Sequence, residues 1–140
     1  GRGFANYIKT TIHVFLNYKA KRYKITVNNQ VVNKAAFLIT IANAAQYGNN
    51  AFIAPNADIT DGMLDVTIIS PFPKYISASL GLKLFRKRIG KSRFVETFKV
   101  KEISIVQFDS NVMHYDGEPV TIESPLNFSI KPLALKVYVP

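Results

Sequence analysis

Three carboxylates crowd one short stretch of the sequence, A-P-N-A-D-I-T-D-G-M-L-D at positions 54–65. They are Asp58, Asp61 and Asp65, and no Asp or Glu precedes position 58. A hard cation such as magnesium or calcium prefers carboxylate and carbonyl oxygens, so Asp58 and Asp61 on one irregular loop could hold such an ion. Asp before Gly also commonly makes a turn, because its carboxylate hydrogen-bonds the nearby backbone. The spacing leaves both interpretations open, and Asp65 could simply be solvated on one face of a strand.

A second acidic turn, H-Y-D-G-E-P at positions 114–119, contains Asp116 and Glu118. Asp-Gly between two strand-like segments is a strong hairpin signal. A carboxylate at such a strand end could also act as a general base, with His114 close by in sequence. Histidines are more often packed or solvated than catalytic, so we interpret His114 and His13 as ordinary side chains. The sequence has no H-E-x-x-H, Walker or G-x-G-x-x-G motif and no Ser-His-Asp order, which argues against the enzyme classes that need them.

The chain is strongly basic, with 18 Lys and Arg against 9 Asp and Glu and a formal net charge of +9. This balance favours anionic partners: phosphates, nucleic acids or acidic lipid surfaces. The basic segment at 85–93 follows an apolar helical stripe, so Leu82 and Phe85 could touch lipid while the cations face anionic headgroups. A solvated helix end is the alternative, since cations are favoured at a helix C-terminus. Nucleic acid is not expected as a partner, because no reading helix or aromatic RNA-binding pattern accompanies the charges.

Length and composition set further bounds. The 140 residues predict one domain, without an internal repeat or a dividing linker. Cysteine is absent, which excludes disulfides and a Cys nucleophile and fits a reducing compartment, the cytoplasm. No apolar run reaches the roughly 20 residues that a membrane-spanning helix needs.

The elements that must position the acidic turns are mostly strands. Tyr23, Ile25 and Val27 alternate with polar residues before the turn-like pair Asn28-Asn29, which predicts a hairpin. Further strand-like segments follow at 35–42, 63–70, 94–100, 103–108, 112–115, 120–122, 126–130 and 135–139. Helical spacing is confined to 3–19 and 74–89, the latter with Gly90 as its stop. The pattern predicts a mainly β protein, an antiparallel β-sandwich or partly closed barrel with two short helices.

The two acidic turns together carry a resemblance to a known family. The order Y-G-N-N-A-F-I-A-P-N-A-D-I-T-D-G-M-L-D-V-T-I-I at 47–69, then H-Y-D-G-E-P-V and finally A-L-K-V-Y-V-P, is similar to the C-terminal domain of the diacylglycerol kinase-like bacterial lipid kinases. These are relatives of sphingosine and ceramide kinases. The segment at 7–27 also resembles the opening helix and strand of that domain, so the similarity covers nearly all of the chain.

The resemblance implies a β-sandwich that closes over a nucleotide-binding domain, with the active site between them. It implies transfer of the ATP γ-phosphoryl group to a lipid hydroxyl by the full-length protein. The Gly-Gly-Asp-Gly-Thr phosphate-binding stretch of the nucleotide-binding domain does not occur in this sequence. Residues 1–140 are therefore expected to be the single C-terminal domain, inactive alone, with ATP bound mainly by the missing N-terminal domain.

Site residues follow from the same resemblance. Asp61 matches the magnesium-binding aspartate, and Asp58 and Met63 match positions that supply further, mostly main-chain, oxygen ligands. Asp116 matches the proposed general base, and Glu118 supports it from the same turn. The implied partners are a lipid substrate, an anionic membrane surface with peripheral association, and the protein's own N-terminal domain; a homodimer is left open. The alternative is a non-catalytic basic β-domain that binds anionic lipid or nucleic acid, with both Asp-Gly turns serving only as turns.

Overall fold

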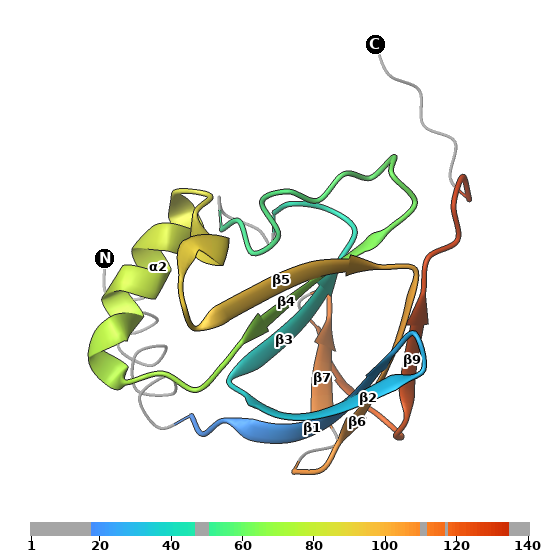
Figure 1. The fold of residues 1–140 in the computed structure, drawn as a ribbon, viewed down its shortest axis with the longest axis horizontal. Coiled ribbons are helices and arrows are strands. Elements are labelled where there is room, and N and C mark those ends of the chain that lie inside the picture. The colour runs from blue at the N-terminus through green and yellow to red at the C-terminus, as the bar shows by residue number, and fades with distance from the viewer. Residues whose placement is uncertain (1–17, 47–50, 110–111, 117, 135–140) are drawn as a thin grey trace.

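Two antiparallel sheets form the main body of the molecule (Figure 1). The computed structural model describes residues 18–46, 51–109, 112–116 and 118–134. A four-stranded sheet has the order β2-β1-β6-β9 and a three-stranded sheet the order β3-β4-β5, while β7 and β8 pair separately. The strands are β1 Lys21–Val27, β2 Gln30–Ala36, β3 Leu38–Ala42, β4 Leu64–Ile69, β5 Val95–Val100, β6 Glu102–Gln107, β7 Val112–Tyr115, β8 Glu118–Thr121 and β9 Leu126–Ser129. The predicted helix at 3–19 falls almost wholly outside the described residues, and the predicted strand at 135–139 falls entirely outside them.

The β1–β2 hairpin confirms the prediction from the Asn28-Asn29 pair. Val27 pairs with Gln30, so these two asparagines are the whole turn, and their φ angles are 49° and 62°. Positive φ at both central positions is the geometry that matches the twist of a two-residue hairpin, and asparagine tolerates it well. The alternation is also confirmed, because Tyr23 and Ile25 point into the core.

The apolar run at 35–42 was expected to be one strand, and that expectation is wrong. The chain leaves the four-stranded sheet after Ala36 and enters the three-stranded sheet at Leu38. Between them, the Phe37 amide donates a hydrogen bond to the Ile69 carbonyl at 2.7 Å. A continuous apolar run has no marker for such a crossing, because no turn residue or change of period separates its two halves.

The main core lies between the two sheets. It combines side chains of β1, β2, β4, β5 and β6: Tyr23, Ile25, Ala36, Leu64, Val66, Ile68, Val100, Ile103 and Ile105. Strand β4 is the centre of the three-stranded sheet and is covered on both faces. The exposed fraction of Thr67 is only 1%, and its hydroxyl donates to the Ile53 carbonyl at 2.9 Å. The antiparallel β-sandwich predicted from the sequence is therefore confirmed.

A second cluster packs a helical segment against the far end of β4 and β5. It contains Ile53, Ala54, Ile69, Leu80, Ile89 and Val95. The segment comprises a 3-10 turn at Lys74–Ile76, helix α2 at Ser77–Phe85 and a second 3-10 turn at Ile89–Lys91. The helix ends before the predicted stop at Gly90, because Lys87 adopts a φ of 57° and the Arg88 amide reaches back to the Lys83 carbonyl at 2.8 Å. These are the features of a Schellman C-cap, with lysine where glycine is usual.

Candidate functional site

The acidic loop, residues 56–63, leads directly into β4 and is held by its own side chains. One carboxylate oxygen of Asp58 accepts hydrogen bonds from the Thr60 amide at 2.8 Å and the Thr60 hydroxyl at 2.6 Å. One carboxylate oxygen of Asp61 accepts from the Met63 amide at 2.8 Å. Each aspartate thus closes a short turn on the backbone two residues ahead, as the turn interpretation of the sequence predicted.

Gly62 lies at the tip of this turn with a φ of 67°. A Cβ added there would lie 3.6 Å from the Pro132 side chain, an ordinary contact. Backbone conformation is therefore the main reason for glycine at this position, because a side chain would be strained at positive φ. The position of Pro132 also shows that the segment after β9 lies against the acidic loop.

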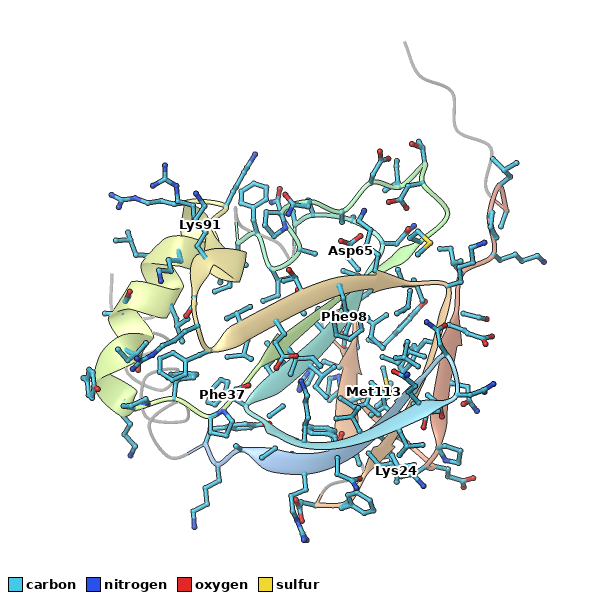
Figure 2. The ribbon with its side chains drawn as sticks, viewed as in Figure 1. Lys24, Phe37, Asp65, Lys91, Phe98 and Met113 are labelled. Atoms are coloured by element: carbon cyan, nitrogen blue, oxygen red, sulfur yellow. The ribbon has the colours of Figure 1, made fainter. Side chains whose placement is uncertain are left out.

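Lys99 is the cation of the acidic loop. It lies on β5 directly opposite Asp65 on β4, as the strand register requires. Its ammonium nitrogen is 2.5 Å from a carboxylate oxygen of Asp61, 3.3 Å from one of Asp65 and 3.2 Å from the Asn56 carbonyl oxygen. Figure 2 shows Asp65 at the start of β4, just below the loop. Three oxygens thus surround the ammonium, and those of Asp61 and Asn56 accept hydrogen bonds from it.

The charges of this cluster stabilise one another. The hydrogen bond from Lys99 is the main cause that lowers the pKa of Asp61, and it raises the pKa of Lys99 in turn. The hydroxyl and amide of Thr60 lower the pKa of Asp58. Both aspartates are therefore held in their ionised form, although their exposure to solvent keeps the energetic effect small.

Asp65 differs from the other two aspartates. Its side chain is only 13% exposed, so the predicted solvated position is not what the fold provides. Its Oδ2 atom is buried and has no hydrogen bond among the described residues; the Lys99 ammonium, 3.3 Å away, forms an ion pair without hydrogen-bond geometry. A buried carboxylate oxygen that depends on one nearby cation is costly to leave unpaired.

The predicted magnesium ligands have oxygen donors, which suit a hard cation in type. Their arrangement does not suit it. Among the described residues, no group of three or more His, Asp or Glu side chains is placed to hold a metal ion. Asp58 is turned toward Thr60, Asp61 is shared between Met63 and Lys99, and a positive charge already occupies the point where the oxygens converge. A magnesium site made by Asp58, Asp61 and Met63 stays a prediction, and we derive no chemical step from it.

The second acidic turn forms the tip of the β7–β8 hairpin. Tyr115 pairs with Glu118, so the turn begins at Asp116, which has a φ of 47°. Strand β8 begins at Glu118, two residues before the start of the strand predicted from V-T-I at 120–122. Asp116, Glu118 and His114 are exposed, and within the described part of the chain no hydrogen bond or ion pair joins them to the acidic loop. The hairpin is confirmed, and the role of Asp116 as a base stays a prediction.

A family model described as the YegS C-terminal NAD kinase beta sandwich-like domain matches residues 2–139. The chain belongs to this family. One relative, "Probable lipid kinase YegS-like" of Pseudomonas aeruginosa (strain UCBPP-PA14), is 28% identical over 138 residues, which cover 99% of this chain and 45% of the relative. A protein of the same name from Xanthomonas euvesicatoria pv. vesicatoria is 31% identical over 103 residues, covering 71% of this chain and 32% of the relative.

Solved structures from Bacillus anthracis str. Sterne share the fold. One gives a TM-score of 0.63 at 25% identity and covers 90% of this chain and 43% of its own. Another, described as a diacylglycerol kinase, gives a TM-score of 0.60 at 23% identity over 89% of this chain and 42% of its own. This YegS-type chain therefore spans less than half the length of the relatives it matches.

The family resemblance did not point to Lys99, which the sequence analysis missed. Asp61 and Lys99 are 38 positions apart, and only the pairing of β4 with β5 brings them together. The available signal was the opposite charge of Asp65 and Lys99 on strands that could be neighbours. Such cross-strand pairs are common in antiparallel sheets, but the register must be known before a pair can be named.

Helix α2 presents a different surface at the other end of β4. The α2 surface comprises exposed apolar side chains along the helical segment, Tyr75, Leu82 and Phe85, and exposed cations just after the helix, Arg86, Lys87 and Arg88. Tyr75 is 77% exposed and Phe85 58%. The Lys87 ammonium lies 4.3 Å from the centre of the Phe52 ring, a cation–π contact. No helix of the described residues is long and apolar enough to cross a bilayer.

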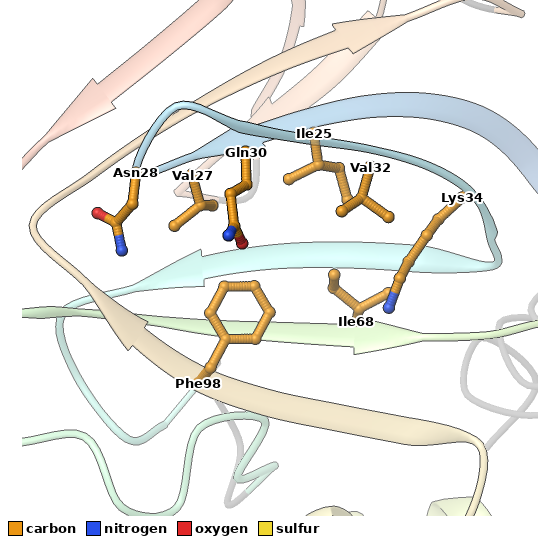
Figure 3. Close-up of a pocket in the computed structure, with 8 residues that line it drawn as sticks. All are labelled: Ile25, Val27, Asn28, Gln30, Val32, Lys34, Ile68 and Phe98. Carbon is orange, nitrogen blue, oxygen red and sulfur yellow. The ribbon is translucent and has the colours of Figure 1, made fainter.

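One concave feature of the described residues is a cavity between the two sheets (Figure 3). It has a volume of about 170 Å³ and apolar walls from both sheets, with Asn28 and Gln30 toward one end and Lys34 at the other. The remaining lining residues are Ile25, Val27, Val32, Ile68 and Phe98. Small-molecule sites usually measure roughly 300–1,000 Å³. The cavity is too small for a lipid substrate, and we assign none to it.

Proposed function

We propose that this chain is the C-terminal domain of an ATP-dependent lipid kinase that phosphorylates a diacylglycerol-like lipid hydroxyl. The observation that carries the proposal is the family match over residues 2–139, together with relatives named as probable lipid kinases. In this proposal a nucleotide-binding domain outside these residues supplies most of the ATP contacts. The chain by itself would then neither bind ATP tightly nor transfer phosphate.

Asp116 is the proposed general base. A lipid hydroxyl is a poor nucleophile at neutral pH, and a carboxylate within about 2.6–3.2 Å can accept its proton as the phosphoryl group transfers. The exposed hairpin tip supports this role, since it leaves Asp116 free to face a cleft formed with another domain. Glu118, next to it on the same hairpin, would add negative charge that favours proton acceptance.

The test is lipid phosphorylation by the full-length protein that contains this chain. We expect Asp116→Asn to lower kcat by at least about 10²-fold, because a positioned general base contributes about 10²–10⁴-fold. Folding should be almost unchanged, since asparagine also suits an Asn-Gly hairpin turn. Glu123→Gln, which removes an exposed carboxylate a few residues further on, is the matched control and should keep near-parental activity.

Activity of Asp116→Asn within a few-fold of the parent, with an unaltered melting curve, would remove Asp116 from catalysis. Absence of lipid phosphorylation by the parent itself, on diacylglycerol, phosphatidylglycerol and sphingosine, would count against the kinase function. Continued binding to anionic vesicles in that case would favour the alternative, a non-catalytic lipid-binding domain.

We also propose that the α2 surface attaches the protein peripherally to anionic membranes. Exposed aromatic and aliphatic side chains beside a cluster of cations fit the interface between headgroups and acyl chains. Replacing Arg86, Lys87 and Arg88 with serine should weaken binding to phosphatidylglycerol-containing vesicles by about 1 kcal/mol per cation. Sedimentation with such vesicles at two salt concentrations measures this loss.

The control for vesicle binding is an equal charge change elsewhere on the surface. Lys24, Lys101 and Lys131 are exposed and lie on the sandwich rather than on α2. Their joint replacement by serine should weaken binding much less than the change on the α2 surface. Equal losses in the two triple variants would mean that net charge, not this surface, determines the attraction to the membrane.

A further inference from the structure

The Lys99 ammonium is coordinated as a bound cation would be. Two carboxylate oxygens and one main-chain carbonyl oxygen surround it, from Asp61, Asp65 and Asn56, at 2.5, 3.3 and 3.2 Å. These are the ligand types that a hard divalent cation selects in a loop. The position that a metal would take is thus filled by a charge that belongs to the chain itself.

Lys99 is held in this position by the sheet. It stands in β5, whose six residues pair with β4 from Leu64↔Val100 to Ile69↔Val95. The ammonium therefore projects from a regular ladder toward a loop that ends where β4 begins. Because the Lys99 side chain is 35% exposed, its flexible stem has room to swing away into solvent.

The carboxylates of Asp61 and Asp65 need a nearby cation whether or not Lys99 is in place. Within the described part of the chain, the Oδ2 atom of Asp65 is buried without a hydrogen bond, and the cation paired with it is Lys99. A divalent ion bound to Asp61 and Asp65 would lie within a few ångströms of the ammonium, and two like charges at that distance repel. The loop can therefore be neutralised by Lys99 or by a metal ion, but not by both at close range.

We propose that Lys99 is the resident cation of the acidic loop, a positioning residue that competes with divalent cations for the carboxylates of Asp61 and Asp65. The loop keeps its shape without a metal while Lys99 is in place, and a metal ion binds there only when Lys99 withdraws. This inference rests on the loop geometry and not on the proposed kinase function.

The experiment compares Lys99→Met with Lys101→Met in the whole chain, using Mn²⁺ as the probe. Both variants lose one positive charge at the same edge of the sandwich, but Lys101 forms no ion pair among the described residues. We expect Lys99→Met to have a lower Tm in EDTA, to recover on adding Mn²⁺, and to bind Mn²⁺ about 5- to 150-fold more tightly than the parent, the usual range for coupled sites. Lys101→Met should behave like the parent.

A double variant, Asp61→Asn with Lys99→Met, should lose the gained affinity, which assigns the ion to these carboxylates. Lys99→Met that binds Mn²⁺ no more tightly than the parent would overturn the proposal. So would an equal gain in Lys101→Met, which would make net charge the cause. If Lys99→Met does not fold, Lys99→Gln replaces it, and paramagnetic broadening of the Gly62 and Asp65 amides in the parent decides: saturation at micromolar Mn²⁺ overturns the proposal, and no broadening supports it.

Discussion

Tyr23 places its phenol in the core between the two sheets, where the residue is only 7% exposed. Burial is the main cause that raises its pKa to about 12, and the nearby Tyr18 and Asp109 add to the shift. A pKa raised above that of the unfolded chain, about 10, means that the folded state resists ionisation. The stabilising contribution is therefore complete below about pH 10 and is lost as the pH rises toward 12.

We expect Tyr23→Phe to flatten the fall of Tm between about pH 10 and pH 12, because phenylalanine has no proton to lose. Thermal unfolding followed by circular dichroism across this range measures the effect. Tyr75→Phe, at a side chain that is 77% exposed, is the control and should leave the parental profile unchanged. Identical alkaline profiles for the parent and Tyr23→Phe would contradict the assignment.

At the residue scale, the sequence predicted local contacts well and distant ones poorly. The turns closed by Asp58 and Asp61 depend on backbone two residues away, so residue type and spacing are enough to predict them. The ion pairs of Lys99 depend on strand register, and so does the burial of Asp65. A single sequence contains the hydrophobic alternation but not the partner strand.

At the scale of elements, the end of helix α2 offers a test of the C-cap. Lys87 occupies the position of positive φ, where a side chain costs about 1–2 kcal/mol relative to glycine. Both Lys87→Gly and Lys87→Ala lose the same charge and the same contact with Phe52, so they differ only in how well the residue tolerates positive φ. Lys87→Gly should therefore be more stable than Lys87→Ala by about 1 kcal/mol. Urea unfolding of the two variants measures the difference in free energy.

The matched pair for this test lies inside the same helix. At Ser79, exposed within α2, the order should reverse, with alanine more stable than glycine by about 1 kcal/mol. Alanine more stable than glycine at both positions would show that Lys87 does not hold the left-handed conformation. Lys87→Gly should still weaken binding to anionic vesicles, which separates the proposed membrane contact from the stability of the fold.

The elements that could be predicted are those whose ends are marked by characteristic turn residues. The Asn-Asn and Asp-Gly turns mark two hairpins in the sequence, and both were found. The crossing at Phe37 has no turn residue, so one apolar run was taken for one strand. The helix end was misplaced because a lysine, not the expected glycine, adopts the capping conformation.

At the scale of the whole molecule, the sandwich was predictable because alternation with period two recurs along the chain and needs no knowledge of pairing. The ion pairs that join the two sheets were not predictable. Lys34 on β2 and Glu96 on β5 form an ion pair that joins the two sheets at their edges, and nothing in their sequence positions links them. The sequence predicts which face of a strand is buried more readily than it predicts which strands pair with each other.

Among the strands that the structure describes, β7 and β8 form ladder pairs only with each other, which has a consequence for hydrogen exchange. An isolated two-stranded hairpin is marginally stable, and the side chains of β7 and β8 are almost all exposed. Its amides should exchange with deuterium by local opening, whereas those of β4, paired on both sides and buried, should exchange only through global unfolding. Exchange followed by mass spectrometry should therefore label 112–121 long before 64–69, and equal protection would contradict this.

Such a difference would divide the two acidic turns by mobility as well as by position. Asp116 would stand on an element that can shift its position at little free-energy cost, while Asp65 stands on β4, the strand expected to open last, and Lys99 on β5, which pairs with it. A partner that docks against the hairpin could then reposition the proposed base without disturbing the charge cluster at the start of β4.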